Sequence, residues 1–227
     1  MGTTLGHGSG TLNPRGTESP ARKAWRDRAG QVWKAGRMPA ADRTPSSPLP
    51  PPVLPPLLPL SPPPALREGG AADAAAVARL HTAGRRSACA GLVPRWVLDA
   101  EAADQELLWT LRLDADYGTP ADAPVLLLAE DGPGGPALGF AHLVPDGGEV
   151  RLEQLHVRPD RTGRGIGTHL LHAALARFPQ APVRLDVLAA NRRAIAFYER
   201  HGARRLGRGT AHFPDGTRLP EYAYGWR

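Results

Sequence analysis

A proline-rich segment restricts where this chain can fold. Residues 49–64 read LPPPVLPPLLPLSPPP and contain nine prolines. Proline lacks the backbone N–H donor that helices and central strands need, so we expect this segment to be extended polyproline II. Residues 1–64 as a whole are rich in Pro, Gly and Arg and show little hydrophobic periodicity. We therefore predict a disordered tail over 1–64 and a single folded domain over 65–227.

The positive charge of the chain is concentrated in the same tail. Residues 1–64 carry eight Lys or Arg and three Asp or Glu, whereas residues 65–227 carry twenty basic and nineteen acidic side chains. A tail that binds nucleic acid is one hypothesis for this charge. Because the domain itself is nearly neutral, we expect it to bind no nucleic acid.

The cysteine and histidine content restricts the chemistry further. Cys89 is the single cysteine, which excludes an internal disulfide and fits a reducing compartment. It stands in a helical Ala-Cys-Ala setting without an identifiable His or Asp partner, so we expect a small buried side chain rather than a nucleophile. The histidines show no metal-ligand spacing, so no metal is expected. Every apolar stretch of the tail is broken by proline, and we expect a cytoplasmic protein without a membrane span.

The hydrophobic pattern from Ala65 onward predicts an α/β (α+β) domain with a mixed, mostly antiparallel central sheet. Strands are predicted at residues 65–69, 125–130, 137–143, 149–157 and 183–188 and as two short segments near the C-terminus, and helices at 74–83, from Pro94, at 105–113, from the glycine-rich loop to about Arg177, and from Asn191 to Gly202.

Residues 161–171, RTGRGIGTHLL, place glycines at three alternate positions directly before a helix. Glycines allow a phosphate to approach the backbone N–H groups of a helix N-terminus, although a flexible connection would also explain them. A Walker A loop is excluded because the Gly-Lys-Ser/Thr ending is absent. A dinucleotide fingerprint with Asp186 is disfavoured, because five residues separate Val157 from Gly163 and Thr168 replaces the third glycine.

Three segments in order carry a family resemblance. Residues 155–159 (LHVRP), 163–167 (GRGIG) and 191–202 (NRRAIAFYERHG) together resemble the GNAT superfamily of acetyl-CoA-dependent N-acetyltransferases, over roughly residues 66–227. Residues 85–94 are similar to the first-helix region of many bacterial members, and the chain looks like an actinobacterial-type enzyme with an unknown small-molecule or protein acceptor. Thr162 departs from the Gln or Arg that is usual there. The resemblance implies the GNAT fold, with about seven strands, a splayed strand pair and about four flanking helices.

The same resemblance implies where the cosubstrate acetyl-CoA binds. A bulge would separate the strand ending at Val157 from the strand 183–188, and the pantetheine arm would enter the gap along the main chain of Leu155 and Val157. Its pyrophosphate would contact the N–H groups of residues 163–168, with the Thr168 hydroxyl as an added donor. Arg161 and Arg164 would be free to meet the 3′-phosphate or solvent. The implied cofactor residues are Leu155, His156, Val157, Arg161, Thr162, Gly163, Arg164, Gly165, Ile166, Gly167, Thr168, Asn191, Ala194 and Phe197.

The implied reaction is direct attack of a primary amine on the thioester, which needs a base because the amine is mostly protonated at neutral pH. Glu153 on the cofactor strand is the first candidate base, and alternation places His156 on the opposite strand face. Tyr198 holds the position of the proton donor to the leaving thiolate. Asn191 is expected both to contact pantetheine and to cap its helix. A non-catalytic acyl-CoA-binding or sensor domain of the same fold is the alternative, and a monomer or homodimer is expected.

Overall fold

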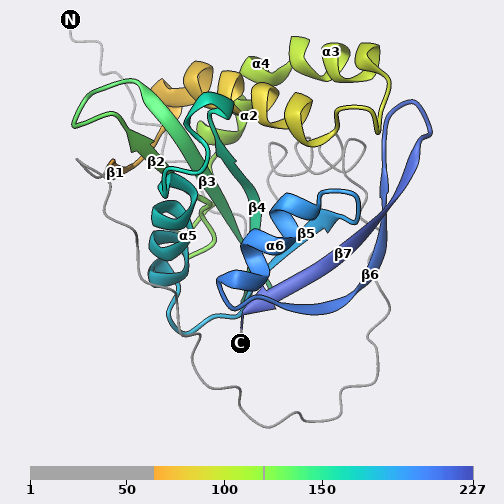
Figure 1. Cartoon of the computed structure of the whole chain (residues 1–227). Coiled ribbons are helices and arrows are strands. Elements are labelled where there is room, and N and C mark those ends of the chain that lie inside the picture. Colours follow the sequence, from red (N-terminus) through yellow and green to blue (C-terminus); the bar gives the residue numbers. More distant parts are fainter. Residues whose placement is uncertain (1–63, 120, 227) are drawn as a thin grey trace, which may run out of the picture.

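The computed structural model describes residues 64–119 and 121–226, so the predicted tail lies outside the described residues apart from Pro64. One sheet runs through this part of the chain (Figure 1). Its strands are β1 (Ala65–Glu68), β2 (Val125–Glu130), β3 (Ala137–Asp146), β4 (Glu149–Val157), β5 (Val183–Leu188), β6 (Arg204–His212) and β7 (Arg218–Trp226). Its helices are α2 (Ala74–Ala88), α3 (Arg95–Ala103), α4 (Gln105–Leu113), α5 (Ile166–Arg177) and α6 (Arg192–Arg200), with short 3-10 turns η1 (Ala71–Asp73) and η2 (Pro159–Arg161).

The strand order is β1-β2-β3-β4-β5-β7-β6, and every neighbouring pair is antiparallel except β4 and β5. The predicted mixed, mostly antiparallel sheet of seven strands is therefore confirmed. The described residues form five α-helices, which agrees with the five helical segments predicted from the hydrophobic pattern and is one more than the about four that the resemblance implied. The mostly antiparallel order also excludes the doubly wound dinucleotide fold.

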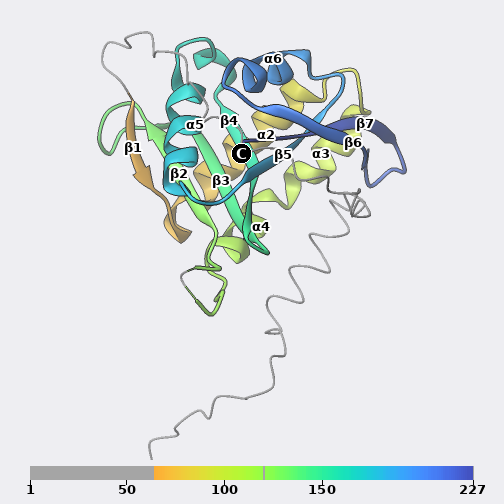
Figure 2. The same cartoon turned by 90° about the horizontal axis from the view of Figure 1, so that it is seen from below.

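Two helical layers cover the sheet. Figure 1 shows α2, α3 and α4 along one face and α5 and α6 along the other, and Figure 2 shows the same layers from the side of α5 and α6. We call these faces the α2 face and the α5 face. Alternate strand residues supply a core on each: Leu127 and Leu185 pack with Leu170 of α5, whereas Leu128 and Phe140 pack with Val77 of α2.

A third apolar cluster lies on the α2 face, where α3 packs against the end of β5 and the segment after β6. It joins Val97 and Leu98 of α3 to Leu188 at the end of β5 and to Phe213 after β6. Cys89 lies in this cluster and is 1% exposed. Burial raises the pKa of its thiol, so the expectation of a small buried side chain is confirmed.

The parallel pair β4–β5 is joined only at its beginning. Val150 pairs with Val183 and Arg151 with Arg184, and the ladder stops there. The C-terminal halves of the two strands diverge, which leaves the β5-facing edge of β4 without a ladder partner among the described residues from Leu152 on. The expected splayed pair is therefore present.

The bulge that accompanies this splay lies on the other edge of β4. In the β3–β4 ladder, Leu152 pairs with Leu143 and Gln154 pairs with His142, so Glu153 has no partner opposite it. The expectation that the bulge interrupts the β4–β5 pairing is thus wrong, because the extra residue lies in the ladder between β4 and β3. Its effect is to bend β4 at the point where β5 has already ended its ladder with it.

Candidate active site

The loop before α5 presents main-chain donors. Gly163 and Gly165 have φ values of 78° and 79°, a left-handed conformation that glycine adopts without strain. Gly165 is the N-cap of α5. Among the residues that the structure describes, none accepts a hydrogen bond from the backbone N–H groups of residues 162–165. Together with the free N–H groups of the first helical turn, they form a concave donor surface that suits an anion.

The hydroxyl groups of this loop are already engaged. The Thr162 hydroxyl donates to the carbonyl oxygen of Pro159 at 3.0 Å. The Nδ1 of His201 lies 2.8 Å from the carbonyl oxygen of Phe197 and therefore carries the ring proton. In the neutral ring Nε2 is then an acceptor, so the Thr168 hydroxyl, 3.1 Å away, donates to it. The Thr168 hydroxyl would have to leave His201 to donate to a pyrophosphate, and its role as an added donor stays a prediction.

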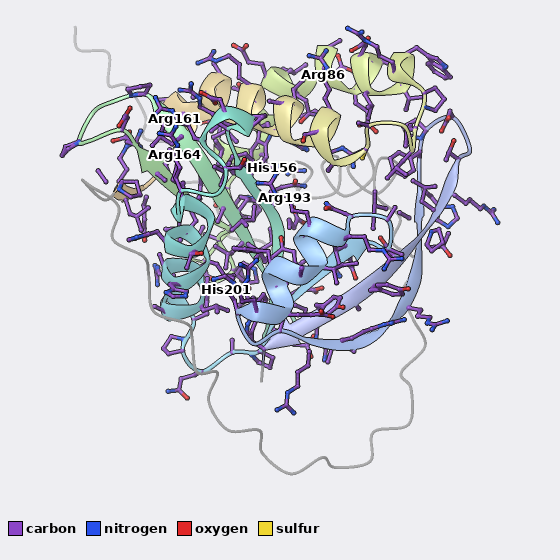
Figure 3. The ribbon with its side chains drawn as sticks, viewed as in Figure 1. Arg86, His156, Arg161, Arg164, Arg193 and His201 are labelled. Atoms are coloured by element: carbon purple, nitrogen blue, oxygen red, sulfur yellow. The ribbon has the colours of Figure 1, made fainter. Side chains whose placement is uncertain are left out.

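Two arginines flank the same loop (Figure 3). Arg161 lies 3.8 Å from a carboxylate oxygen of Asp131 and 3.6 Å from one of Asp160. Arg161 thus has two acidic neighbours, and its contact with a 3′-phosphate stays a prediction. Arg164 is exposed, and no described residue forms an ion pair with it. Arg193, at the start of α6, is a further exposed cation that the sequence analysis did not select.

The α5 face of the splay is lined by apolar side chains from three elements. A Cβ placed on Gly167 would lie 3.6 Å from Cγ2 of Val157 and 3.6 Å from Cζ of Phe197. The end of β4, the first turn of α5 and the middle of α6 therefore meet at Gly167. Leu155 is half-buried against the same core. Ile166 is buried, so only its main chain is available to a ligand.

Helix α6 begins with a side-chain cap. The side-chain Oδ1 of Asn191 accepts a hydrogen bond from the backbone N–H of Ala194 at 3.1 Å, which satisfies one of the free donors of the first turn. The capping role expected of Asn191 is confirmed. The same bond occupies the N–H of Ala194, so that residue has no free main-chain donor for a cofactor.

Tyr198 lies on α6 and packs into the α5-face core. Its ring is 5.3 Å from the ring of Phe197 and 6.1 Å from that of Trp226, measured between centroids. No described residue forms a hydrogen bond with its hydroxyl. Burial raises the pKa of this hydroxyl well above its usual value, so it keeps its proton over the physiological range.

Glu153 lies on the α2 face, at the bulge. Its Oε2 is 3.5 Å from Nδ1 of His142 and 3.7 Å from Nη1 of Arg112. Burial by itself raises the pKa of Glu153, but His142 and Arg112 outweigh it and lower the pKa below its ordinary value. His142 is fully buried, and burial lowers its pKa. Glu153 is therefore an ionised carboxylate that lies between the imidazole of His142 and the guanidinium of Arg112.

His156 also lies on the α2 face. Its ring stacks on that of His81 of α2 with a centroid distance of 5.2 Å, and its Nε2 lies 2.8 Å from Oε1 of Gln154. Burial lowers the pKa of His156 to about 4. The expectation that His156 and Glu153 occupy opposite faces is wrong, because the bulge at Glu153 shifts the alternation of β4 by one residue.

Two further carboxylates on this face were not selected from the sequence. Asp186 of β5 accepts a hydrogen bond from Arg151 at 3.2 Å, and Glu221 of β7 is buried opposite Leu188. The sequence signal was present in the strand alternation, which puts Asp186 and Leu188 on one face. The pairing of β7 with β5 rather than only with β6 could not be read from the chain, so Glu221 was missed.

A cleft of about 840 Å³ lies between α2, the β2–β3 turn and η2. Most of its charged side chains are paired with one another: Arg67 contacts Asp73 and Glu130, and Arg158 contacts Asp160. Arg79 also lines the cleft and forms no ion pair with a described residue. We assign no role to the cleft. In the described part of the chain no group of three or more His, Cys, Asp or Glu is arranged to hold a metal ion, and no helix there is long and apolar enough to cross a membrane.

Comparison with known proteins agrees with this geometry. The model of the acetyltransferase (GNAT) family matches residues 92–203. Mycothiol acetyltransferase from Clavibacter sepedonicus is 44% identical over 82 residues, which are 35% of this chain and 27% of that protein. The chain thus matches only about a quarter of the length of this curated relative.

Solved structures resemble the whole described domain. A GCN5-related N-acetyltransferase from Rhodopseudomonas palustris is 27% identical, with a TM-score of 0.56 over 72% of this chain and 94% of that chain. The PaiA N-acetyltransferase from Thermoplasma acidophilum, solved in complex with coenzyme A, is 17% identical, with a TM-score of 0.55 over 69% of this chain and 96% of that chain. The second likeness concerns the fold alone.

Proposed function

Because the chain belongs to the acetyltransferase (GNAT) family, we propose that it is an N-acetyltransferase that transfers the acetyl group of acetyl-CoA to a primary amine. The observation that carries the proposal is the splay between β4 and β5, which opens beside the unpartnered N–H groups of residues 162–165. An extended thiol arm with a pyrophosphate fits this pairing of a free strand edge with an anion-binding helix N-terminus.

The cosubstrate would follow the α5 face. Its pyrophosphate would be bound by the N–H groups of residues 163–168, with Arg164 exposed nearby for a further phosphate. The free main-chain edge of Leu155 and Val157 would bind the pantetheine amides. Phe197 and Gly167 would form its apolar wall, and Asn191 would contact it beside the N-terminus of α6.

The amine would approach from the α2 face and attack the thioester carbonyl carbon directly. A C–N bond forms, the C–S bond breaks, and the departing thiolate takes a proton. Tyr198 is the proposed donor of that proton, because its buried hydroxyl remains protonated at neutral pH. Glu153, proposed from the sequence as the base, has surroundings that keep it ionised. This charge would attract and orient the ammonium group of the acceptor.

The domain bounds, the oligomeric state and the compartment are part of the same proposal. Residues 65–227 would form the catalytic domain and residues 1–64 a tail without a catalytic role. The protein would act in the cytoplasm as a monomer or homodimer, without a metal, a membrane or nucleic acid as partner. The single cysteine of the chain fits a reducing compartment.

The test is thiol release from acetyl-CoA with a panel of primary amines, combined with calorimetric titration of coenzyme A. Amine-dependent thiol release together with binding of coenzyme A is the expected result. Binding of coenzyme A without turnover of any amine would instead support a non-catalytic acyl-CoA sensor. Absence of coenzyme A binding would overturn both.

A further inference from the structure

Glu221 of β7 is a buried carboxylate without a partner. The residue is 4% exposed. Its backbone belongs to the ladders with β5 and β6, but no described group forms a hydrogen bond or ion pair with its side chain. A Cβ on Gly209 of β6 would lie 3.1 Å from its Oε1, so the glycine leaves room for the carboxylate. Burying a charge without compensation is costly in folding free energy. A position of this kind in an enzyme therefore indicates a functional group.

The neighbours of Glu221 place it at the splay. Its partner in the ladder is Leu188, at the end of β5 where β4 has already diverged. Asp186 lies two residues before Leu188, so it is a diagonal neighbour of Glu221 on the same face. Arg151 of β4 donates to Asp186 at 3.2 Å. Leu188 itself packs with Leu98 of α3 and Ala211 of β6.

The charges around Glu221 suit proton transfer at neutral pH. Burial and the nearby negative charge of Asp186 raise the pKa of Glu221 to about 7, against the opposing charge of Arg151. A general base works best when its pKa is close to the working pH. Glu153 differs, because His142 and Arg112 lower its pKa and so weaken it as a base.

We propose that Glu221 accepts the proton of the acceptor's ammonium group while Asp186 binds that group beside it. This inference rests on the proposed acetyl transfer and specifies its acceptor as a primary alkylamine that is protonated in solution. The ammonium ion gives one proton to Glu221, and the freed lone pair attacks the thioester. The nitrogen loses a second proton as the C–S bond breaks, which balances the proton taken by the thiolate. One proton is thus released to solvent per turnover.

The first experiment compares Glu221→Gln with the wild type for two kinds of nucleophile. The probes are the best alkylamine of the panel and O-methylhydroxylamine, whose nitrogen is unprotonated at neutral pH. With the alkylamine we expect kcat/KM to fall by on the order of 100-fold or more, and with O-methylhydroxylamine to change much less. The affinity for coenzyme A is expected to stay the same. Glu106→Gln, which removes an exposed carboxylate of α4, is the control and should leave both rates unchanged.

The second experiment uses Asp186→Asn, which removes the negative charge that raises the pKa of Glu221. In the wild type the alkylamine rate should rise with pH through an apparent pKa near 7. We expect this rise of the rate with pH to occur at lower pH in Asp186→Asn. The shift keeps the proposal testable even if Glu221→Gln does not fold, which circular dichroism would show.

The outcomes separate the proposal from the activity on which it rests. A Glu221→Gln enzyme that retains the alkylamine rate, or that loses both rates equally, would overturn the role of Glu221 while leaving acetyl transfer intact. An unchanged pH dependence of the alkylamine rate in Asp186→Asn would likewise overturn the role of Glu221. A wild-type protein that binds coenzyme A but acetylates no amine would overturn the proposed function, and this inference with it.

Discussion

At the scale of single residues, the hydroxyl of Tyr198 is the group whose environment most clearly sets its chemistry. Burial among Phe197, Trp226 and the α5-face core disfavours the tyrosinate and raises the pKa of the hydroxyl. A proton donor to a thiolate has to hold its proton until the C–S bond breaks. The environment of Tyr198 provides this over the whole physiological pH range.

Tyr198→Phe removes this hydroxyl and keeps the ring packing. We expect kcat to fall by about 100-fold or more, while the affinity for coenzyme A and the stability change little. Because the pKa of Tyr198 is raised, the wild-type rate should show no alkaline loss from this group near pH 10. Stopped-flow thiol release measures the first effect. A variant with an unchanged kcat would show that Tyr198 is a packing residue only.

Single residues were also where the sequence was least informative. The cap of Asn191 could be predicted because it involves neighbouring residues of one helix, whereas the role of Tyr198 was implied by the family resemblance and stays a prediction. The engagement of Thr168 by His201 could not be predicted, because the two residues are 33 positions apart and meet only when α5 and α6 pack. Glu221 was missed for the same reason, since its role depends on which strand β7 pairs with.

At the scale of elements, the bulge in β4 explains which predictions failed. The bounds of β4 and β5 were predicted correctly, because their apolar alternation is strong. A strict alternation of side chains would place Glu153 and His156 on opposite faces of β4. The extra residue at Glu153 shifts the alternation, so both side chains lie on the same face. Nothing in the sequence of β4 marks the bulge, because it is decided by how β3 pairs with it.

Helix α2 shows the same dependence on a distant element. It was predicted to end at residue 83, just before Gly84, yet it continues to Ala88. A glycine in a helix interior costs about 1 kcal/mol relative to alanine. Here it is required, because a Cβ on Gly84 would lie within bonding distance of Nδ1 of His156. The glycine thus marks a close contact of α2 with β4 and does not mark a helix end.

Gly84→Ala tests this contact. Helix propensity alone predicts a gain in stability, whereas the collision with His156 predicts a net loss of about 1–3 kcal/mol in the free energy of unfolding. We expect the loss, since the ring of His156 is held by His81 and Gln154. Urea unfolding measures it. Gly70→Ala, with no atom within 4 Å of the added Cβ, is the control, and a stabilised Gly84→Ala protein would refute the packing argument.

At the scale of the whole molecule, the two faces of the sheet differ in character. The α5 face is apolar and is bordered by the glycine-rich loop before α5. The α2 face carries the buried His81 and His142 and the half-buried His156 around Trp109, whose indole N–H donates to Nδ1 of His81 at 3.1 Å. Because an indole nitrogen only donates, His81 is neutral in the folded protein. Burial lowers the pKa of all three histidines.

This arrangement makes the folded domain sensitive to acid. Unfolded histidines take up protons near pH 6.5, whereas the buried ones resist protonation until lower pH, about 4 for His156. The unfolded state therefore binds more protons between these limits, so stability is lost as the pH falls through this window. Glu221 acts in the opposite direction, because its raised pKa lets the folded state bind a proton between about 7 and 4.5. Asp186, whose pKa is also raised by burial, acts in the same direction as Glu221, and His172, whose pKa is also lowered by burial, acts with the other histidines. Because four histidines oppose two carboxylates, we expect a net loss.

His81→Gln isolates one of these contributions. The glutamine Oε1 can accept the Trp109 N–H, and nothing remains there to titrate. Between pH 6.5 and about 5, we expect the free energy of unfolding of the wild type to fall more steeply than that of His81→Gln, by up to about 1.4 kcal/mol per pH unit. Urea unfolding at a series of pH values gives both slopes. His212→Gln, on the exposed side of β6, should retain the wild-type slope. Equal slopes for the wild type and His81→Gln would contradict the neutral His81 that its hydrogen bond from Trp109 indicates.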